Sequence, residues 1–270
     1  MLDVTCWMMT RNEEFWGGHV LSATLESGAP RVIVADTGST DATLAILREA
    51  AGGDPRVTFL EWPGGEATPE SVTATRQRML DATATEWGMI IDADEFYYPD
   101  KLREVLAQNI PPHCRLAHTS LDVIRWHGGA FWRAERFGKE AFFRVAGLHW
   151  ERGYPFEAPF YGSEPCSGPR HYFGGGPHGM HFHNLRRSSR DDEVLHRGDM
   201  PTREPLVAKV EMPFDLGRWP NEYADMMVAE MLQRATLLQP VPLPAVGRPH
   251  SEARVDMSRV KGEMGRMAPD

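Results

Sequence analysis

Cysteine is scarce in this chain, with three residues in 270, and no two of them have metal-binding spacing. Cys6, Cys114 and Cys166 are an odd number and lie far apart in the sequence. This pattern argues against a disulfide framework or a zinc knuckle, and it predicts a protein of a reducing compartment.

Long hydrophobic runs are also missing. No apolar stretch approaches the roughly 20 residues that a membrane-spanning helix needs, and the N-terminus lacks a basic segment followed by an apolar one. We therefore expect a cytoplasmic protein without a transmembrane segment. Positive charge is in deficit too, with a formal net charge of -9. Because binding to a nucleic-acid backbone relies on clustered Lys and Arg, a nucleic-acid acceptor is disfavoured.

What the chain does contain is an apolar run, residues 89–91, that ends in two carboxylates one residue apart, Asp92 and Asp94. A run of this kind is typical of an interior strand in a parallel sheet, and open α/β sheets bind ligands at the carboxyl ends of their strands. Residues i and i+2 of a strand share one side, so both carboxylates could hold a hard cation, and the cation a diphosphate. An isolated Asp-x-Asp is also common in surface turns.

Two earlier segments have the same organisation. A β-branched run, residues 31–35, ends at Asp36 and is followed by Gly38, which permits a tight turn, and then by a helical pattern. The first strand, residues 4–9, ends in the polar segment 10–14, and we expect a helix after Gly18. In a parallel sheet these three polar strand ends would meet, so the fold class is α/β.

Four segments, residues 9–14, 34–41, 75–76 and 91–96, resemble in order and spacing the signature segments of family 2 glycosyltransferases. The resemblance covers residues 1 to about 110 closely. It implies a GT-A type fold: a Rossmann-like, mostly parallel sheet flanked by helices, with a smaller β-rich acceptor section. Within the family, the chain resembles the branch of the lipopolysaccharide-core transferases.

The remaining sequence is organised differently. Pro99 suits the first turn of a short helix, a β-rich section follows from Leu116 to about Trp150, and a helical pattern runs from Asn221 to about Leu238. We therefore expect a nucleotide-sugar-binding half at 1–110. The acceptor and metal-completing half of the same domain would then occupy 111–238, including a C-terminal helix, with a flexible tail at 239–270.

The resemblance also assigns roles in binding a nucleotide. It implies that Thr10, Asp36 and Arg76 contact the nucleotide and that Asp36 accepts the uracil N3 proton, which makes a UDP-sugar the expected donor. Each of these three residues could instead serve as a cap or turn partner. The other expected nucleotide-binding residues within the signature segments are Arg11, Asn12, Gly38, Asp92 and Ala93.

A metal site is expected around Asp92 and Asp94. His181 and His183 alternate as in a strand and would point the same way, which makes the pair a source of a nitrogen ligand. The resemblance implies that one of them completes the metal shell, and we favour His181. Carboxylate ligands suit Mn²⁺ or Mg²⁺, and a histidine favours Mn²⁺.

An inverting transfer needs a general base to accept the proton of the acceptor hydroxyl, and carboxylates in pockets serve that role. Glu157 and Glu151 are the candidates that follow the β-rich section. In the lipopolysaccharide-core branch this region carries a His-Glu pair, and Glu157 matches its glutamate, with Phe156 in place of the histidine.

The sequence thus predicts a metal-dependent glycosyltransferase that moves a sugar from a nucleotide-sugar donor to a hydroxyl acceptor, such as a glycan or a lipid-linked sugar, with inversion. One alternative is an Asp-x-Asp phosphohydrolase with the first aspartate as nucleophile. Enzymes of that kind usually carry the pair on their first strand, whereas here it lies on a later one. A second alternative is a non-catalytic module that binds nucleotide-sugars.

Overall fold

The structure is a computed structural model that describes residues 1–60, 68–127, 130–152, 157–166, 168–182 and 212–213. The chain divides into two units, Met1–Leu238 and Gln239–Asp270, and the second lies wholly outside the described residues. The C-terminal helix predicted at 221–238 and the tail predicted at 239–270 also fall outside them. Those boundaries therefore stay predictions.

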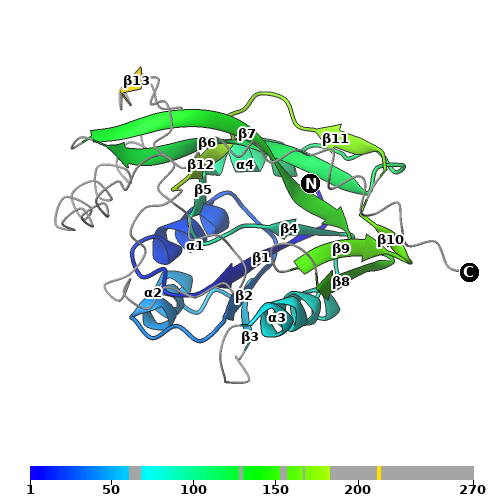
Figure 1. Cartoon of the computed structure of the whole chain (residues 1–270), viewed down its shortest axis with the longest axis horizontal. Coiled ribbons are helices and arrows are strands. Elements are labelled where there is room, and N and C mark those ends of the chain that lie inside the picture. The colour runs from blue at the N-terminus through cyan, green and yellow to red at the C-terminus, as the bar shows by residue number, and fades with distance from the viewer. Residues whose placement is uncertain (61–67, 128–129, 153–156, 167, 183–211, 214–270) are drawn as a thin grey trace, which may run out of the picture. The chain divides into compact units, whose positions relative to one another are not determined.

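One mixed sheet organises the described part of the first unit (Figure 1). Its strand order is β3-β2-β1-β4-β7-β6-β12-β5, with β11 paired to β6 and β13 to β7. The neighbours β3, β2, β1 and β4 are all parallel. These four strands are β1 (Val4–Thr10), β2 (Val32–Asp36), β3 (Val57–Leu60) and β4 (Trp87–Ile90).

The other half of the sheet is built on a long antiparallel pair, β6 (Leu116–His127) and β7 (Ala130–Arg144), with β7 joined antiparallel to β4. Strand β12 (Gly179–His181) inserts between β6 and β5 (Glu95–Tyr97), parallel to the former and antiparallel to the latter. This insertion brings residues about 85 positions apart in sequence side by side. The remaining strands of this sheet are β11 (Arg170–Tyr172) and β13 (Met212–Pro213).

A second, three-stranded sheet has the order β10-β9-β8 and is antiparallel. Its strands are β8 (Leu148–Arg152), β9 (Glu157–Tyr161) and β10 (Glu164–Pro165). Strands β6, β7 and most of β8 fall within the β-rich section predicted from Leu116 to about Trp150, whereas β9 and β10 lie beyond it. None of the described helices is long and apolar enough to cross a membrane.

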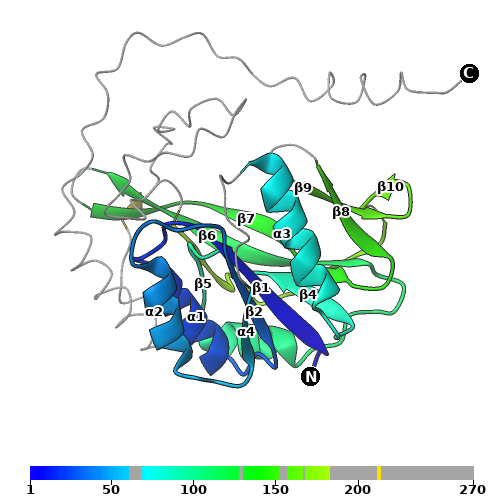
Figure 2. The ribbon, with the colours of Figure 1, turned by 90° about the horizontal axis from the view of Figure 1, so that it is seen from below.

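The helices cover both faces of the parallel strands. Figure 2 shows α1 and α2 on one side of β1 and β2, and α3 with β8 and β9 on the other. Pro99 occupies the first turn of α4, as the sequence predicted. Within the described residues the helices are α1 (Gly17–Glu26), α2 (Thr43–Ala51), α3 (Pro69–Asp81) and α4 (Pro99–Leu106).

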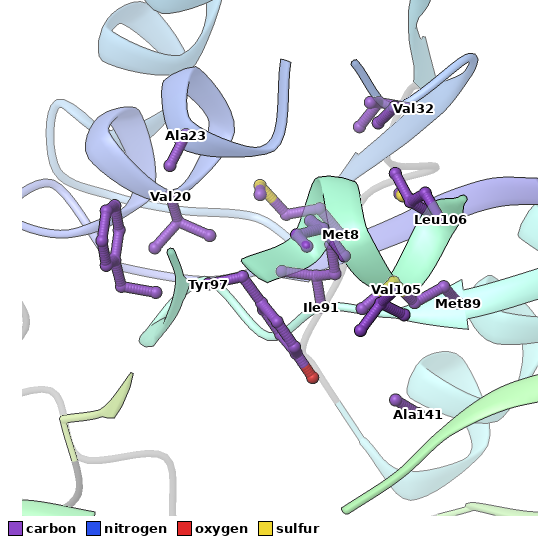
Figure 3. Close-up of a cluster of buried hydrophobic side chains, with 14 of the residues drawn as sticks. Met8, Val20, Ala23, Val32, Met89, Ile91, Tyr97, Val105, Leu106 and Ala141 are labelled. Atoms are coloured by element: carbon purple, nitrogen blue, oxygen red, sulfur yellow. The ribbon is translucent and has the colours of Figure 1, made fainter. Parts of the chain in front are cut away.

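Alternation along the buried strands divides the core into two clusters. Cys6 and Met8 of β1 pack with the residues of α1 and α4, whereas Trp7 packs with Met79 and Leu80 of α3. Figure 3 shows part of the first cluster, in which side chains of both helices surround those of β1 and β4. Because both faces of these strands are buried, their sequences are continuously apolar rather than alternating. The predicted α/β class is confirmed.

Two glycine positions explain close approaches in this core. A Cβ at Gly88 of β4 would lie 1.9 Å from the ring of Trp7, so the indole packs directly on the strand. At Gly18 a Cβ would lie 2.7 Å from Ile46 of α2. The expectation that α1 begins only after Gly18 is therefore wrong by two residues: Gly17 and Gly18 lie within the helix, where their small size lets α1 approach α2.

Candidate functional site

Parallel register brings the three predicted polar strand ends to one edge of the sheet. Thr10, the last residue of β1, lies opposite Asp36, the last residue of β2. The backbone N–H of Ile91, next to the end of β4, donates to the carbonyl of Trp7 and continues the pairing of β1 with β4 toward Asp92. The carboxyl-end edge therefore holds all three predicted segments, as open α/β sheets do at their ligand sites.

The loop after β1 is fastened to the loop after β2 by side-chain hydrogen bonds. Asn12 Oδ1 accepts from the backbone N–H of Thr40 at 2.8 Å, and the N–H of Asn12 donates to Ser39 Oγ at 2.9 Å. Arg11 donates to the carbonyl of Thr37 at 2.8 Å. Asn12 takes a positive φ of 52°, which asparagine adopts more readily than most residues. Arg11 and Asn12 thus hold the loop after β1 against the loop after β2.

Asp36 uses only one carboxylate oxygen to fold its own turn. Oδ1 accepts from the N–H groups of Gly38 at 2.8 Å and Ser39 at 2.7 Å, and Gly38 has a φ of 88°. Oδ2 of Asp36 and Oγ1 of Thr10 are buried and have no hydrogen-bond partner among the described residues. Buried polar atoms in native proteins usually have a partner, so these two atoms are available to a ligand.

The Asp-x-Asp segment forms the turn between β4 and β5. The N–H of Glu95 donates to the carbonyl of Asp92 at 2.9 Å, and Glu95 Oε2 accepts from the N–H of Asp92 at 3.1 Å. The carbonyl of Asp94 accepts from the N–H of Phe182, just past β12. That backbone bond fixes the Asp-x-Asp turn against β12, which carries His181.

Of the two predicted histidines, His181 lies beside Asp94. Its Nε2 is 3.5 Å from Asp94 Oδ2. Burial lowers the pKa of His181, but the hydrogen bond and charge of Asp94 outweigh that effect and raise the pKa above its usual value. His183 lies outside the described residues, so the preference for His181 stays a prediction.

A lysine that the sequence did not single out lies among these carboxylates. Lys139 of β7 donates from Nζ to Asp92 Oδ2 at 3.0 Å and also pairs with Glu95 Oε2. Its side chain is 11% exposed and that of Glu95 only 3%, whereas that of Asp92 is 45% exposed. Asp92 is therefore the member of this ion-pair group that a ligand can reach.

Electrostatics within the cluster keep Asp92 ionised. Partial burial raises the pKa of Asp92, but the positive charges of Lys139 and Arg76 outweigh that effect and hold the pKa below its usual value. Burial and the neighbouring carboxylates Asp92 and Asp94 raise the pKa of Glu95 to about 7, with Lys139 opposing them. The carboxylates of Asp92 and Glu95 also raise the pKa of Lys139 despite its burial, so its ammonium is charged.

Arg76 connects the cluster to the second face of the sheet. It is buried on α3, with its guanidinium 5.7 Å from the ring centroid of Trp150 on β8. Its charge acts on Asp92, so the structure brings two predicted site residues into one electrostatic environment. Ala93 is buried within the turn that carries both aspartates.

The two candidate bases lie on neighbouring strands of the small sheet. Glu151 of β8 is exposed and its Oε1 is 2.9 Å from Nε2 of His149. Glu157 begins β9, where its backbone pairs with Arg152. The side chain of Glu157 is outside the described atoms, so its role remains a prediction.

The side chains near the Asp-x-Asp turn supply some of the ligands that a divalent ion needs. Among the described residues, no group of three or more His, Cys, Asp and Glu is arranged to hold a metal by itself. The side chains of Asp94 and His181 nevertheless lie close together, and the carboxylate of Asp92 is accessible to a ligand. Mg²⁺ and its close analogues are commonly bound by one or two carboxylates together with substrate phosphates and water, so this partial set fits an ion that arrives with a diphosphate.

Sequence reasoning missed Lys139 and the part played by Glu95. The signal for Lys139 was weak. Lys139 is two residues from Phe137 and from Ala141, a spacing that places all three on the same side of a strand, and a lysine on the inward side requires a buried partner. Which carboxylates supply that partner depends on the pairing of β7 with β4 and β6, which the local sequence does not encode.

The sequence is similar to those of known proteins. The family model described as "Glycosyl transferase family 2" matches residues 8–176, more than half of the chain. The succinoglycan biosynthesis protein ExoU of Rhizobium meliloti (strain 1021) is 29% identical over 90 residues, which are 33% of this chain and 25% of that protein. The chain thus matches about a quarter of this relative's length. Neither finding specifically supports the lipopolysaccharide-core branch.

Several solved structures are similar in part. S. aureus TarS 1-349 has a TM-score of 0.49 at 12% identity, covering 67% of this chain and 60% of that one. The mannosyltransferase PcManGT from Pyrobaculum calidifontis, solved with GDP-Man and Mn²⁺, has a TM-score of 0.39 at 21% identity, covering 53% and 44%. Glucosyl-3-phosphoglycerate synthase from Mycobacterium tuberculosis, solved with Mg²⁺ and UDP, has a TM-score of 0.33 at 21% identity, covering 43% and 42%.

Proposed function

The chain belongs to glycosyl transferase family 2, and on that premise we propose that it transfers a glycosyl group from a UDP-sugar to a hydroxyl acceptor, with inversion and with a divalent cation. One observation carries the proposal. The edge that holds the unsatisfied oxygens of Asp36 and Thr10 also holds the group of Asp92, Asp94 and His181. Neighbouring strand ends thus carry both the atoms proposed to bind the base and the charged groups proposed to bind the phosphates.

The uridine assignment rests on the state of Asp36. Its Oδ1 is committed to two backbone N–H groups, which leaves Oδ2 as a fixed, buried acceptor. Uracil presents a donor at N3, whereas cytosine presents an acceptor there. An anionic acceptor therefore suits uracil, and binding uracil would relieve the unsatisfied oxygen.

Asp92, Asp94 and His181 are proposed to hold Mn²⁺ or Mg²⁺ together with the diphosphate, and the nitrogen ligand favours Mn²⁺. A bound divalent cation supplies Lewis-acid stabilisation of the charge that grows on the leaving diphosphate. Arg76 and Lys139 add positive charge at the same edge. A glutamate of the small sheet, Glu157 in our assignment, accepts the proton of the attacking hydroxyl while the bond to the diphosphate breaks.

Replacing Asp36 with asparagine is expected to exchange nucleotide preference rather than destroy the site. The amide oxygen can still accept from Gly38 and Ser39, which turns the amide nitrogen toward the base. UDP affinity should fall about tenfold to a hundredfold, since a donor then faces the N3 donor of uracil, while CDP affinity should hold or rise. Calorimetric titration of both nucleotides measures the ratio, and a parallel loss of both affinities would contradict base readout by Asp36.

Replacing His181 with alanine is expected to weaken Mn²⁺ binding in the presence of UDP by at least about tenfold. His181 is the histidine whose Nε2 lies 3.5 Å from Asp94 Oδ2. His183→Ala is the matched control and should have the smaller effect. A manganese titration followed by electron paramagnetic resonance compares the two, and equal, negligible effects would remove both histidines from the metal site.

The two alternative functions remain experimentally distinct from glycosyl transfer. A phosphohydrolase would release inorganic phosphate from small phosphoesters, with Asp92 as nucleophile. Oδ2 of Asp92 instead accepts a hydrogen bond from the ammonium of Lys139, and the family match favours transfer. A binding module would take up UDP with metal and show no turnover of any UDP-sugar with any acceptor.

A further inference from the structure

Lys139 occupies the cation-binding side of the Asp-x-Asp turn. Its Nζ contacts the oxygen of Asp92 at 3.0 Å and pairs at the same time with the nearly buried Glu95. Asp92 is one of the two carboxylates to which a divalent ion is assigned. The ammonium group and the proposed divalent ion would therefore share the carboxylate of Asp92.

Charge balance explains why a lysine is tolerated there. Asp92, Asp94 and Glu95 bring three carboxylates to one turn. The positive charges of Lys139 and Arg76 act on Asp92, and those of Lys139 and His181 act on Glu95. A second cation entering alone would be repelled by Lys139, whereas a diphosphate entering with it would neutralise both.

We propose that Lys139 is an intramolecular counter-cation that competes with the divalent ion for Asp92. When ion and nucleotide bind together, the ammonium of Lys139 leaves Asp92 and pairs with the donor diphosphate. The proposal rests on the proposed function, because it needs a diphosphate at this edge. Free metal then binds weakly, and metal and UDP each strengthen the binding of the other. By linkage, the two strengthening factors are equal.

A purely structural lysine makes a different prediction. If Lys139 served only to neutralise Glu95, its removal would disturb the turn and weaken both metal and nucleotide binding. Competition instead predicts effects of opposite sign. Without Lys139, the affinity for free Mn²⁺ rises because a competing charge is gone, and the affinity for UDP at saturating Mn²⁺ falls because a phosphate ligand is gone.

The test compares the whole chain with its Lys139→Met and Lys139→Arg variants by manganese titration, with and without UDP. We expect Lys139→Met to bind free Mn²⁺ at least about fivefold more tightly than the unchanged protein, and the strengthening by UDP to shrink by a similar factor. Lys139→Arg should keep the unchanged behaviour. Lys101→Met removes a lysine of α4 whose side chain is 27% exposed and pairs with Glu104. This variant controls for the change in net charge.

Folding of the variants is checked by thermal unfolding, since Lys139→Met leaves Glu95 buried without its cation. The double variant Lys139→Met with Glu95→Gln removes both charges, and it should show the same tighter binding of free Mn²⁺. Unchanged or weaker Mn²⁺ binding by the folded variants, beside normal binding of Mn²⁺ with UDP by the unchanged protein, would overturn this inference alone. Failure of the unchanged protein to bind Mn²⁺ even with UDP would overturn the proposed function as well.

Discussion

Asp94→Asn is expected to lower the metal-dependent affinity for UDP by about a hundredfold or more. The change keeps the shape of a side chain that is 8% exposed, and it removes the negative charge beside Nε2 of His181. Since Lys139 already pairs with Asp92, we expect the proposed divalent ion to depend most on Asp94. Calorimetric titration of UDP in Mn²⁺, repeated in EDTA, measures the loss.

Asp100→Asn is the matched control for that experiment. It removes the same charge from an exposed aspartate on α4, where the partner is Arg103, and it should leave UDP affinity unchanged. Undiminished UDP binding by Asp94→Asn, or equal UDP binding by the unchanged protein in Mn²⁺ and in EDTA, would show that the Asp-x-Asp turn holds no ion needed for the nucleotide.

The strand ends of the first hundred residues could be predicted because their signals are local. All five residues of β2 are buried, and the run ends at an aspartate whose turn needs the glycine two residues later. Parallel strands then place Thr10 opposite Asp36 without further information. Most of the edge proposed to bind the nucleotide therefore follows from hydrophobic pattern and turn chemistry.

The ion-pair cluster could not be predicted in the same way. Lys139 reaches Asp92 across 47 residues of sequence, through a long hairpin whose other edge pairs with β12. A local pattern shows that residues 116–144 form strands, but it does not give the register that sets one lysine beside one turn. The same limit applied to His181, since its closeness to Asp94 depends on the pairing of β12 with β5.

The choice between the two candidate bases is informed by the register of the small sheet. Residues paired across β8 and β9 share a face, and Arg152 is paired with Glu157. The backbone of Glu157 therefore lies beside that of Arg152, two residues from Trp150, whose ring lies against Arg76. Glu151 belongs to the opposite face, where it pairs with His149 and is 53% exposed.

Glu157→Gln is accordingly expected to reduce glycosyl transfer by about a hundredfold or more while UDP binding stays nearly intact. The amide keeps the size of the side chain and loses the ability to accept a proton. Glu151→Gln, the matched control, should change transfer little, because an exposed ion pair with a histidine contributes little. Transfer assays on both variants, beside UDP titrations, separate loss of chemistry from loss of binding. A nearly normal Glu157→Gln enzyme beside an inactive Glu151→Gln enzyme would move the base to the face of His149, and two active variants would exclude both glutamates.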